Sequence, residues 1–467
     1  MIELDSPETV RGGIHGEESS DGWLAPLLAS QVRIDRWIAK IDAMLGEQLD
    51  AILHHPEFQS LEAAWRGLEF VVNRIEAGRG IQVAMWNCSK QELSDDLADA
   101  AERTKSRFFR TVYESHYGQH GGVPFAAIFA NFSVTAAFDD VALLRGMASV
   151  AAMSHAPVFV DAHPSLFAPS KRGNGSPENA SFEELSAATD LGAIFEGPSF
   201  IKWHDLRTSE DSRYLGILLP RMRLRSAYRD ATESAETFVY DETIAAHGDH
   251  LWGSATYAFS LRLAESYARD RTAMRLLDTF LAAPPVFEAH EVMGDDACKP
   301  PVEVLFSRRI EEALAELGFI PLTCDPVDGS LRFASASSLQ MPKTFGRSDG
   351  GEQATLNYLL GTRIPYLLFV CRFAHQLKVF QREKLGGHHT REQLQTQLTA
   401  QLRRYVDTKD NPSAATRFQY PLRGAKVELV DIPGQPGWYG MNVVIRPHMR
   451  YRDAEFELDV TGRIDRR

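Results

Sequence analysis

Cysteine is scarce in this chain of 467 residues, which contains only Cys88, Cys298, Cys324 and Cys371. The four are far apart in sequence, and no C-x-x-C motif occurs. A disulfide framework and a cysteine-based zinc site both need closely spaced cysteines, so the sequence favours neither. Scattered cysteines are typical of free thiols in a reducing compartment.

Long hydrophobic runs are missing as well. The longest, such as Tyr366–Cys371 and Gly146–Met153, are far shorter than the ~20 residues that span a bilayer. The chain begins Met-Ile-Glu-Leu-Asp, without the basic and apolar regions of a secretory signal. Its net charge of −13 does not attract nucleic acid or anionic lipid. We therefore expect a cytoplasmic protein that neither inserts into a membrane nor binds nucleic acid.

The common catalytic motifs are also absent. The chain has no G-x-x-x-x-G-K-[ST] phosphate loop, no G-x-G-x-x-G after a strand and no G-x-S-x-G elbow. Two polar clusters remain, His54-His55 and Glu210–Arg213. Adjacent histidines point in different directions, and mixed charges more often form surface or interface ion pairs. The sequence therefore predicts no enzyme activity, no cofactor and no metal, with a soluble α/β enzyme built on these clusters as the remote alternative.

The share of apolar residues, 44%, is normal for a folded protein, and the length predicts two or three domains. Changes in hydrophobic period along the chain divide it into five parts. We expect a polar, disordered N-terminus (1–30), a helical region (31–80), α/β domains (81–350), a helical block (351–410) and a C-terminal β region (411–467).

The N-terminal helical region carries two amphipathic patterns. The first predicts a helix from Gln31 to Ile52. The second follows Pro56, which suits a first helical turn because its missing N–H needs no partner there. Its apolar residues recur every three or four positions, and we call them the Phe58–Ile75 stripe: Phe58, Leu61, Trp65, Leu68, Val72 and Ile75. Such a stripe must be buried, either on the chain's own core or on another chain.

The central part shows strand and helix signals in alternation. Ile81–Trp86 alternates as a strand does, and Ser89-Lys90-Gln91-Glu92 is a capping box that predicts a helix start. A strand within 124–132, a helix over 139–153 and a strand over 156–160 predict a βαβ unit. Downstream, Arg221, Arg223 and Arg225 alternate, which suits either an acidic partner or a solvated face.

The last part of the chain predicts three strands, Ala425–Val430, Trp438–Ile445 and Ala454–Val460. In an isolated chain, the last two would leave an open sheet edge, which is an aggregation hazard unless a partner strand covers it. Strand addition from a neighbouring subunit would satisfy those backbone groups.

Several long stretches together resemble the large subunit of the type VI secretion contractile sheath, the TssC/VipB family. They occur in family order between Gln31 and the C-terminus. The matching stretches are His54–Leu68, Glu210–Arg221 (EDSRYLGILLPR), Leu251–Phe259 (LWGSATYAF), Pro301–Leu322, Arg372–His375 and Tyr420–His448 (YPLRGAKVELVDIPGQPGWYGMNVVIRPH).

The resemblance implies a mechanical function. It implies an α/β phage-tail-sheath-like core with an outer helical domain and C-terminal strands shared between subunits. The implied partners are a TssB/VipA-like small sheath subunit, neighbouring copies of the chain, an Hcp-like inner tube and a baseplate. The AAA+ unfoldase ClpV is a further partner, although only about thirty mostly polar residues precede Gln31, where family members often carry a longer extension.

We therefore predict a sheath subunit that contracts around the tube, with a phage-tail-like extracellular injection particle as the alternative. Its interface residues are expected on the apolar stripe, in the charged cluster and on the terminal strands. They are Phe58, Leu61, Trp65, Leu68, Glu210, Asp211, Arg213, Arg221, Trp438, Val443, Val444, Ile445, Phe456, Leu458 and Val460.

Overall fold

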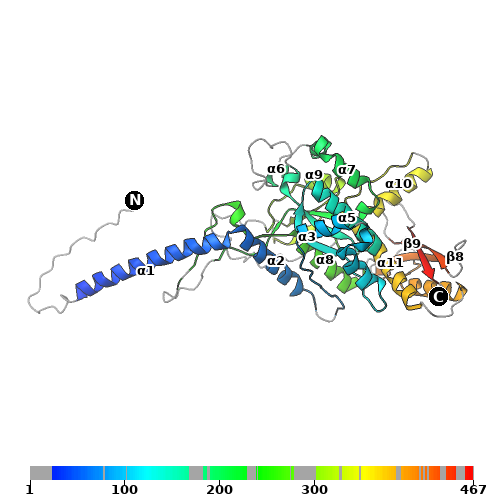
Figure 1. Ribbon diagram of the computed structural model, residues 1–467, viewed down its shortest axis with the longest axis horizontal. Coiled ribbons are helices and arrows are strands. Elements are labelled where there is room, and N and C mark those ends of the chain that lie inside the picture. The colour runs from blue at the N-terminus through cyan, green and yellow to red at the C-terminus, as the bar shows by residue number, and fades with distance from the viewer. Residues whose placement is uncertain are drawn as a thin grey trace, which may run out of the picture. The chain divides into compact units, whose positions relative to one another are not determined.

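A computed structural model of the chain forms two compact units (Figure 1). One comprises residues 1–58 and 227–249, and the other comprises residues 59–226 and 250–467. The structure describes residues 24–76, 79–100, 102–167, 182–186, 190–228, 238, 240–273, 275–277, 301–325, 329–346, 349–384, 391–409, 412–413, 416–417, 420–431, 438–448 and 458–465. Most of the segment expected to be disordered, residues 1–23, therefore lies outside the described part.

The smaller unit is built on helix α1 (Leu24–Leu53), which confirms the helix predicted from Gln31 to Ile52. Its C-terminal end is held by the segment 240–249. The Tyr240 hydroxyl donates to Asp50 Oδ1 at 2.5 Å, and His54 Nε2 lies 3.1 Å from Glu242 Oε1. Helix α2 (Pro56–Val72) follows after a two-residue break, with Pro56 at its first position as expected.

The larger unit contains a five-stranded sheet with the order β1-β2-β3-β6-β7. The first four strands are parallel, and β7 is antiparallel to β6. The predicted βαβ unit is present, because α5 (Phe138–Ser154) connects the parallel strands β1 and β2. The strands are β1 (Ile128–Val134), β2 (Val158–Ala162), β3 (Leu215–Leu219), β6 (Phe319–Cys324) and β7 (Leu331–Phe333).

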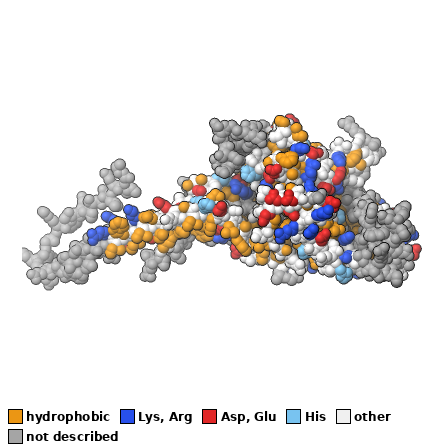
Figure 2. Space-filling view, viewed as in Figure 1, with side chains coloured by type: hydrophobic (Ala, Val, Ile, Leu, Met, Phe, Trp, Pro, Cys, Tyr) orange, Lys and Arg blue, Asp and Glu red, His pale blue; other side chains and the backbone are white. Residues whose placement is uncertain are grey.

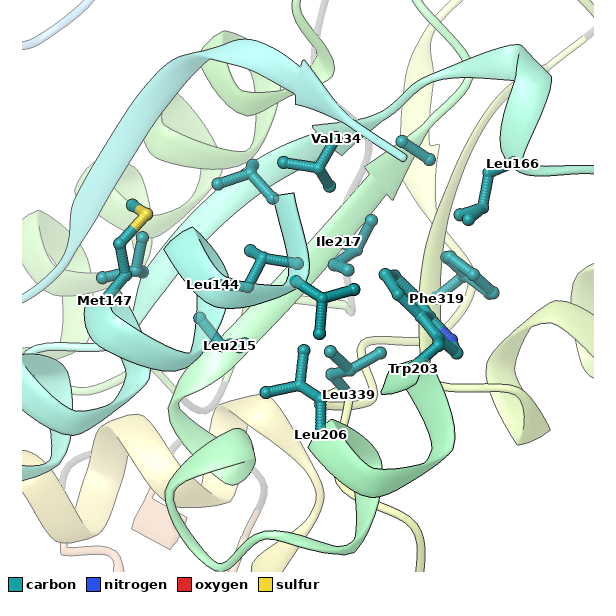
Figure 3. Close-up of a cluster of buried hydrophobic side chains, with 14 of the residues drawn as sticks. Val134, Leu144, Met147, Leu166, Trp203, Leu206, Leu215, Ile217, Phe319 and Leu339 are labelled. Carbon is teal, nitrogen blue, oxygen red and sulfur yellow. The ribbon is translucent and has the colours of Figure 1, made fainter. Parts of the chain in front are cut away.

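Both faces of the three inner strands, β2, β3 and β6, are buried, as expected for parallel strands covered by helices. Val158 and Val160 of β2 belong to one hydrophobic cluster, whereas Phe159 belongs to the other. The first cluster, part of which Figure 3 shows around Ile217 and Phe319, packs beneath α3 (Lys90–Asp99), α5, α7 (Ile201–Thr208) and α9 (Arg308–Glu316). The second packs beneath α2, α8 (Ala255–Asp270) and α11 (Ile364–Lys384). The α/β class predicted from the sequence is confirmed.

Short elements connect these layers. Residues 107–118 form one helix whose second part has π-type hydrogen bonds. The short elements are α4 (Arg107–Phe109), η3 (Arg110–Gly118), α6 (Glu183–Ser186), β4 (Met222–Arg223), β5 (Trp252–Gly253) and the 3₁₀ turns η2 (Arg103–Lys105), η4 (Pro164–Leu166), η7 (Gly192–Glu196), η8 (Pro198–Phe200), η9 (Asp211–Tyr214) and η10 (His247–Asp249).

The C-terminal part combines three helices with a three-stranded antiparallel sheet of order β10-β9-β8. A third hydrophobic cluster joins α11 and α12 to β8 and β9. The sequence predicts the first two strands correctly, and the described part of the third begins at Leu458, because residues 454–457 of that prediction lie outside the described residues. The elements are α10 (Asp349–Gly361), α11, α12 (Arg391–Arg403), β8 (Leu422–Asp431), β9 (Trp438–Pro447) and β10 (Leu458–Asp465).

The predicted strand Ile81–Trp86 differs from the structure. Residues 81–88 are extended, but within the described part of the chain they join no sheet. The capping box that follows is confirmed: the Glu92 N–H donates to Ser89 Oγ at 3.1 Å, and the Ser89 N–H donates to Glu92 Oε2 at 2.8 Å. The helix predicted after this segment is present, whereas the segment itself has no strand partner among the described residues.

Asp161 is an acidic residue inside β2, next to the N-terminus of α8. Burial raises the pKa of its carboxyl to about 7, although hydrogen bonds from Ser254 and the α8 backbone oppose the shift. The folded state therefore holds a proton that the unfolded state releases near pH 4. The contribution of Asp161 to stability is therefore greatest in acid and falls as the pH rises from about 4 to 7, by roughly 4 kcal/mol for a gap of about three pH units.

We predict that Asp161→Asn raises the melting temperature above pH 7 and that its advantage disappears toward pH 4, because asparagine mimics the protonated acid. Melting curves between pH 4 and 8.5 test this. Asp205→Asn is the control, since the Arg145 hydrogen bond and charge hold the pKa of exposed Asp205 below its usual value. It should be slightly destabilising at neutral pH, and equal pH profiles for both variants would contradict the prediction.

Candidate interaction surfaces

Helix α1 carries a continuous apolar surface that other described residues leave exposed. Figure 2 shows hydrophobic side chains gathered along this helix. Seven of them, which we call the α1 stripe, are 43% to 61% exposed: Ile34, Trp37, Ile38, Ile41, Met44, Leu45 and Ile52. Covering one such side chain stabilises by about 1.5–3 kcal/mol, so the stripe is a strong candidate for a binding surface.

Helix α2 has two different faces. Ala63, Gly67, Phe70 and Val71 are the buried residues, and the hydrophobic ones among them pack into the second cluster of the larger unit. The Phe58–Ile75 stripe points mostly elsewhere: Leu61 and Trp65 are each 58% exposed. Phe58 and Val72 are also exposed, Leu68 is half-buried, and Ile75 packs against the core. Most of the stripe is therefore not the face that packs on the chain's own core.

The orientation of α2 is fixed by a close contact and a buried ion pair. Tyr257 of α8 packs directly on Gly67, and its hydroxyl donates to the Ala64 carbonyl at 3.3 Å. Arg225 Nε donates to Glu62 Oε1 at 2.9 Å, and both side chains are nearly inaccessible to solvent. An ion pair removed from water is costly to break, because it leaves an uncompensated charge. Helix α2 therefore presents Leu61 and Trp65 to solvent.

Glu210 is the centre of a polar cluster on the surface. Its carboxylate accepts hydrogen bonds from Arg213 at 2.6 Å, from Gln340 at 3.1 Å, from Tyr358 of α10 and from Lys343. Partial burial opposes ionisation, but these hydrogen bonds and positive charges hold the pKa of Glu210 below its usual value. The cluster ties α10 to the end of α7, and the Glu210 carboxylate has its hydrogen-bond partners within the chain. Asp211 lies beside it, and partial burial raises its pKa.

The alternating arginines also have partners within the chain. Arg221 binds Glu303 through two hydrogen bonds of 2.9 Å, and Arg225 binds Glu62. Their partners lie 82 and 163 residues away in sequence. Arg225 is nearly inaccessible, so neither an acidic partner nor a solvated face describes it, whereas Arg221 keeps part of its side chain exposed beside its own ion pair.

The predicted residues of the C-terminal strands fall into different environments. Val443 and Ile445 are fully buried in the third cluster, and Val444 is half-buried. Strand β9, which also contains Trp438, is the central strand of its sheet, so the open edge expected there is wrong, whereas β10 lies at an edge as expected. Leu458 and Val460 lie on β10, whose backbone alone is described, and Phe456 lies outside the described residues.

The two clusters considered as catalytic sites form ordinary polar contacts. His54 lies between Glu242 and Asp249, with an Nδ1 to Oδ1 distance of 3.8 Å for the latter. Among the described residues, no group of histidine, cysteine, aspartate and glutamate is arranged to hold a metal ion. Every helix in that part of the chain is also too short or too polar to cross a bilayer.

Comparison with known proteins matches almost the whole chain. A VipB family model, described as the EvpB/VC_A0108 tail sheath N-terminal domain, matches residues 35–340. A second, the EvpB/VC_A0108 tail sheath gpW/gp25-like domain, matches residues 353–464. A relative from Pseudomonas aeruginosa, named type VI secretion system sheath protein TssC1, is 33% identical over 440 residues. The aligned region covers 92% of this chain and 86% of the relative.

We predict that Gly67→Ala destabilises the chain by about 1–3 kcal/mol through overpacking against Tyr257. A Cβ at Gly67 would lie 2.3 to 2.6 Å from three atoms of the tyrosine ring. Gly46→Ala is the matched control, because a Cβ at this α1 position meets nothing within 4 Å. It should stabilise by ~0.5–1 kcal/mol through helix propensity, and similar urea midpoints for both variants would disprove the contact.

Proposed function

The chain belongs to the VipB family of tail sheath proteins, and we propose that it is the large structural subunit of a type VI secretion contractile sheath. In this proposal it pairs with a TssB/VipA-like small subunit in the bacterial cytoplasm. The heterodimers polymerise around an Hcp-like inner tube, starting from a baseplate. Contacts with the tube, the baseplate and a ClpV unfoldase rest on family membership alone.

The α1 stripe is the observation that carries the pairing with a small subunit. Seven large apolar side chains on one helix would not remain in water in the working state of the protein. Leu61 and Trp65 on α2 add further exposed apolar surface. Helix α2 packs on the chain's own core through Ala63, Phe70 and Val71, which leaves its other face exposed. We propose that the N-terminal helices, residues 31–80, use their exposed apolar faces to dock on the small subunit.

The C-terminal sheet supports the proposed contacts between neighbouring subunits. Apart from a single bridge between Leu422 and Val406, strands β8 and β10 each have one side without a strand partner among the described residues. Backbone groups on such an edge can pair with a strand of another chain. Shared strands would keep subunits linked while they rotate, and contraction would then follow from relaxation of a strained extended packing. Phe456, Leu458 and Val460 remain proposed interface residues.

We predict that Ile41→Glu weakens binding to the small subunit roughly 10- to 100-fold, because it removes an apolar contact and buries a charge. Its melting temperature should match that of the parent chain, since Ile41 is exposed. Ala43→Glu is the matched control, as it places the same charge on the opposite side of α1. Binding is measured by titration of the purified proteins, and assembly by electron microscopy after co-expression.

Equal affinities for the two variants would rule out the α1 stripe as the binding surface. Tubes formed by this chain without any small subunit would instead favour a sheath of a phage-tail-like extracellular particle.

A further inference from the structure

Residues 81–88 (IQVAMWNC), which we call the 81–88 segment, have a strand sequence but no strand neighbour. The segment alternates between two sides and contains β-branched and aromatic residues, as strands do. In the structure it is extended over its whole length. Of all the backbone N–H and C=O groups of residues 81–88, none forms a hydrogen bond with another described residue.

The two ends of the segment are held by the larger unit. Ile81 packs against the second hydrophobic cluster, and Cys88 packs against the first. The Trp86 ring stacks on buried Phe108, with ring centroids 5.8 Å apart. The capping box at Ser89 then starts α3. The segment is therefore kept extended by contacts at its ends, which lowers the conformational entropy lost when a partner binds.

The middle of the segment is unprotected. Val83 and Met85, on the side opposite Trp86, are 49% and 67% exposed. None of the eight residues is charged. Natural sheet edges avoid unwanted pairing by means of lysine, proline or bulges, and residues 82–87 carry none of these features. An uncharged, extended and apolar stretch of this kind is an aggregation hazard unless it is covered in the working state.

A sheet edge lies beside the end of the segment. Lys90, the first residue of α3, donates from Nζ to the Ser133 carbonyl of β1 at 2.9 Å and forms an ion pair with Asp140. Strand β1 lies at one of the two edges of the five-stranded sheet. The segment thus ends at an edge that has one side without a strand partner in the described part of the chain.

We propose that the 81–88 segment pairs with an extended strand of the small sheath subunit, which completes a β-sheet across the two chains. This inference rests on the proposed function and names a second contact of the same complex, separate from α1. Strand addition gives affinity through main-chain hydrogen bonds, and Val83 and Met85 supply side-chain contacts.

A small subunit fits this site better than a second copy of the chain does. Antiparallel pairing of two 81–88 segments would be an isologous contact, which closes into a two-fold dimer instead of extending a helix. The strand partner is therefore assigned to a different polypeptide.

Hydrogen exchange on the full chain and on its purified complex with the small subunit tests the proposal. The amides of residues 82–87 should exchange within seconds in the free chain and become protected in the complex. Protection only after the chain self-associates without the small subunit would assign the strand to a second copy and overturn the proposal. A complex in which residues 82–87 stay unprotected, both as a heterodimer and as an assembled sheath, would also overturn it.

Proline variants test the hydrogen bonds directly. Backbone N–H groups alternate between the two edges of a strand, so V83P/M85P removes donors from one edge and Q82P/A84P from the other. At least one pair should weaken binding tenfold or more, with melting temperatures of the free chain unchanged within about 2 °C. V83A/M85A retains all donors and should weaken binding less than the sensitive proline pair. Parent affinity in both proline variants would refute strand addition.

The same experiments distinguish failure of the proposed function from failure of the strand pairing. If the parent chain and the small subunit form no complex at all, the proposed function fails. If they form a complex that Ile41→Glu disrupts, while residues 82–87 stay unprotected and tolerate proline, only the strand pairing fails.

Discussion

Helix α2 approaches α8 so closely at Gly67 that a single added carbon would overlap the Tyr257 ring. This contact and the buried pair of Glu62 and Arg225 fix the rotation of α2 about its own axis. Once that rotation is fixed, the side chains on its other face have no place in the chain's own core. The exposed surface at Leu61 and Trp65 is thus a consequence of tight packing elsewhere on the same helix. The close packing that Gly67 permits therefore determines that Leu61 and Trp65 are exposed to solvent.

The two regions matched by the tail sheath domains are joined by buried polar contacts. His375 of α11 lies 3.0 Å from the Ser154 carbonyl, and Arg382 donates to the carbonyls of Tyr117 and Gly122 at 3.1 and 2.8 Å. Burial lowers the pKa of His375 to about 4, so the imidazole is neutral at pH 7. These contacts, together with the Glu210 cluster, hold α10 and α11 on the α/β core. Polar partners fix geometry more strictly than apolar packing does, so these contacts define how α10 and α11 lie on the core.

The sequence predicts the individual elements well because each has a local signal. The period of α1, the capping box at Ser89 and the βαβ spacing depend on residues within a few turns of each other. The exposed surfaces, in contrast, depend on contacts between residues far apart in sequence, which no local pattern predicts. Glycine and alanine add little to an amphipathic pattern, so Gly67 and Ala63 do not reveal the packing face of α2. The partners of Arg221 and Arg225 are distant in sequence, and the central place of β9 depends on which strands pair with it.

The disagreement at residues 81–88 has a different cause. A strand signal reflects side-chain alternation and propensity, and both are present in the segment. Strand structure additionally requires a neighbour, because the hydrogen bonds of a sheet are never made within one strand. A segment can therefore have the sequence pattern of a strand and still form no sheet in the single chain, when its neighbouring strand belongs to another molecule. The same reasoning applies to the α1 stripe, whose period specifies a buried face that a single chain does not bury. Both features indicate a sequence whose hydrophobic pattern is completed only in an assembly.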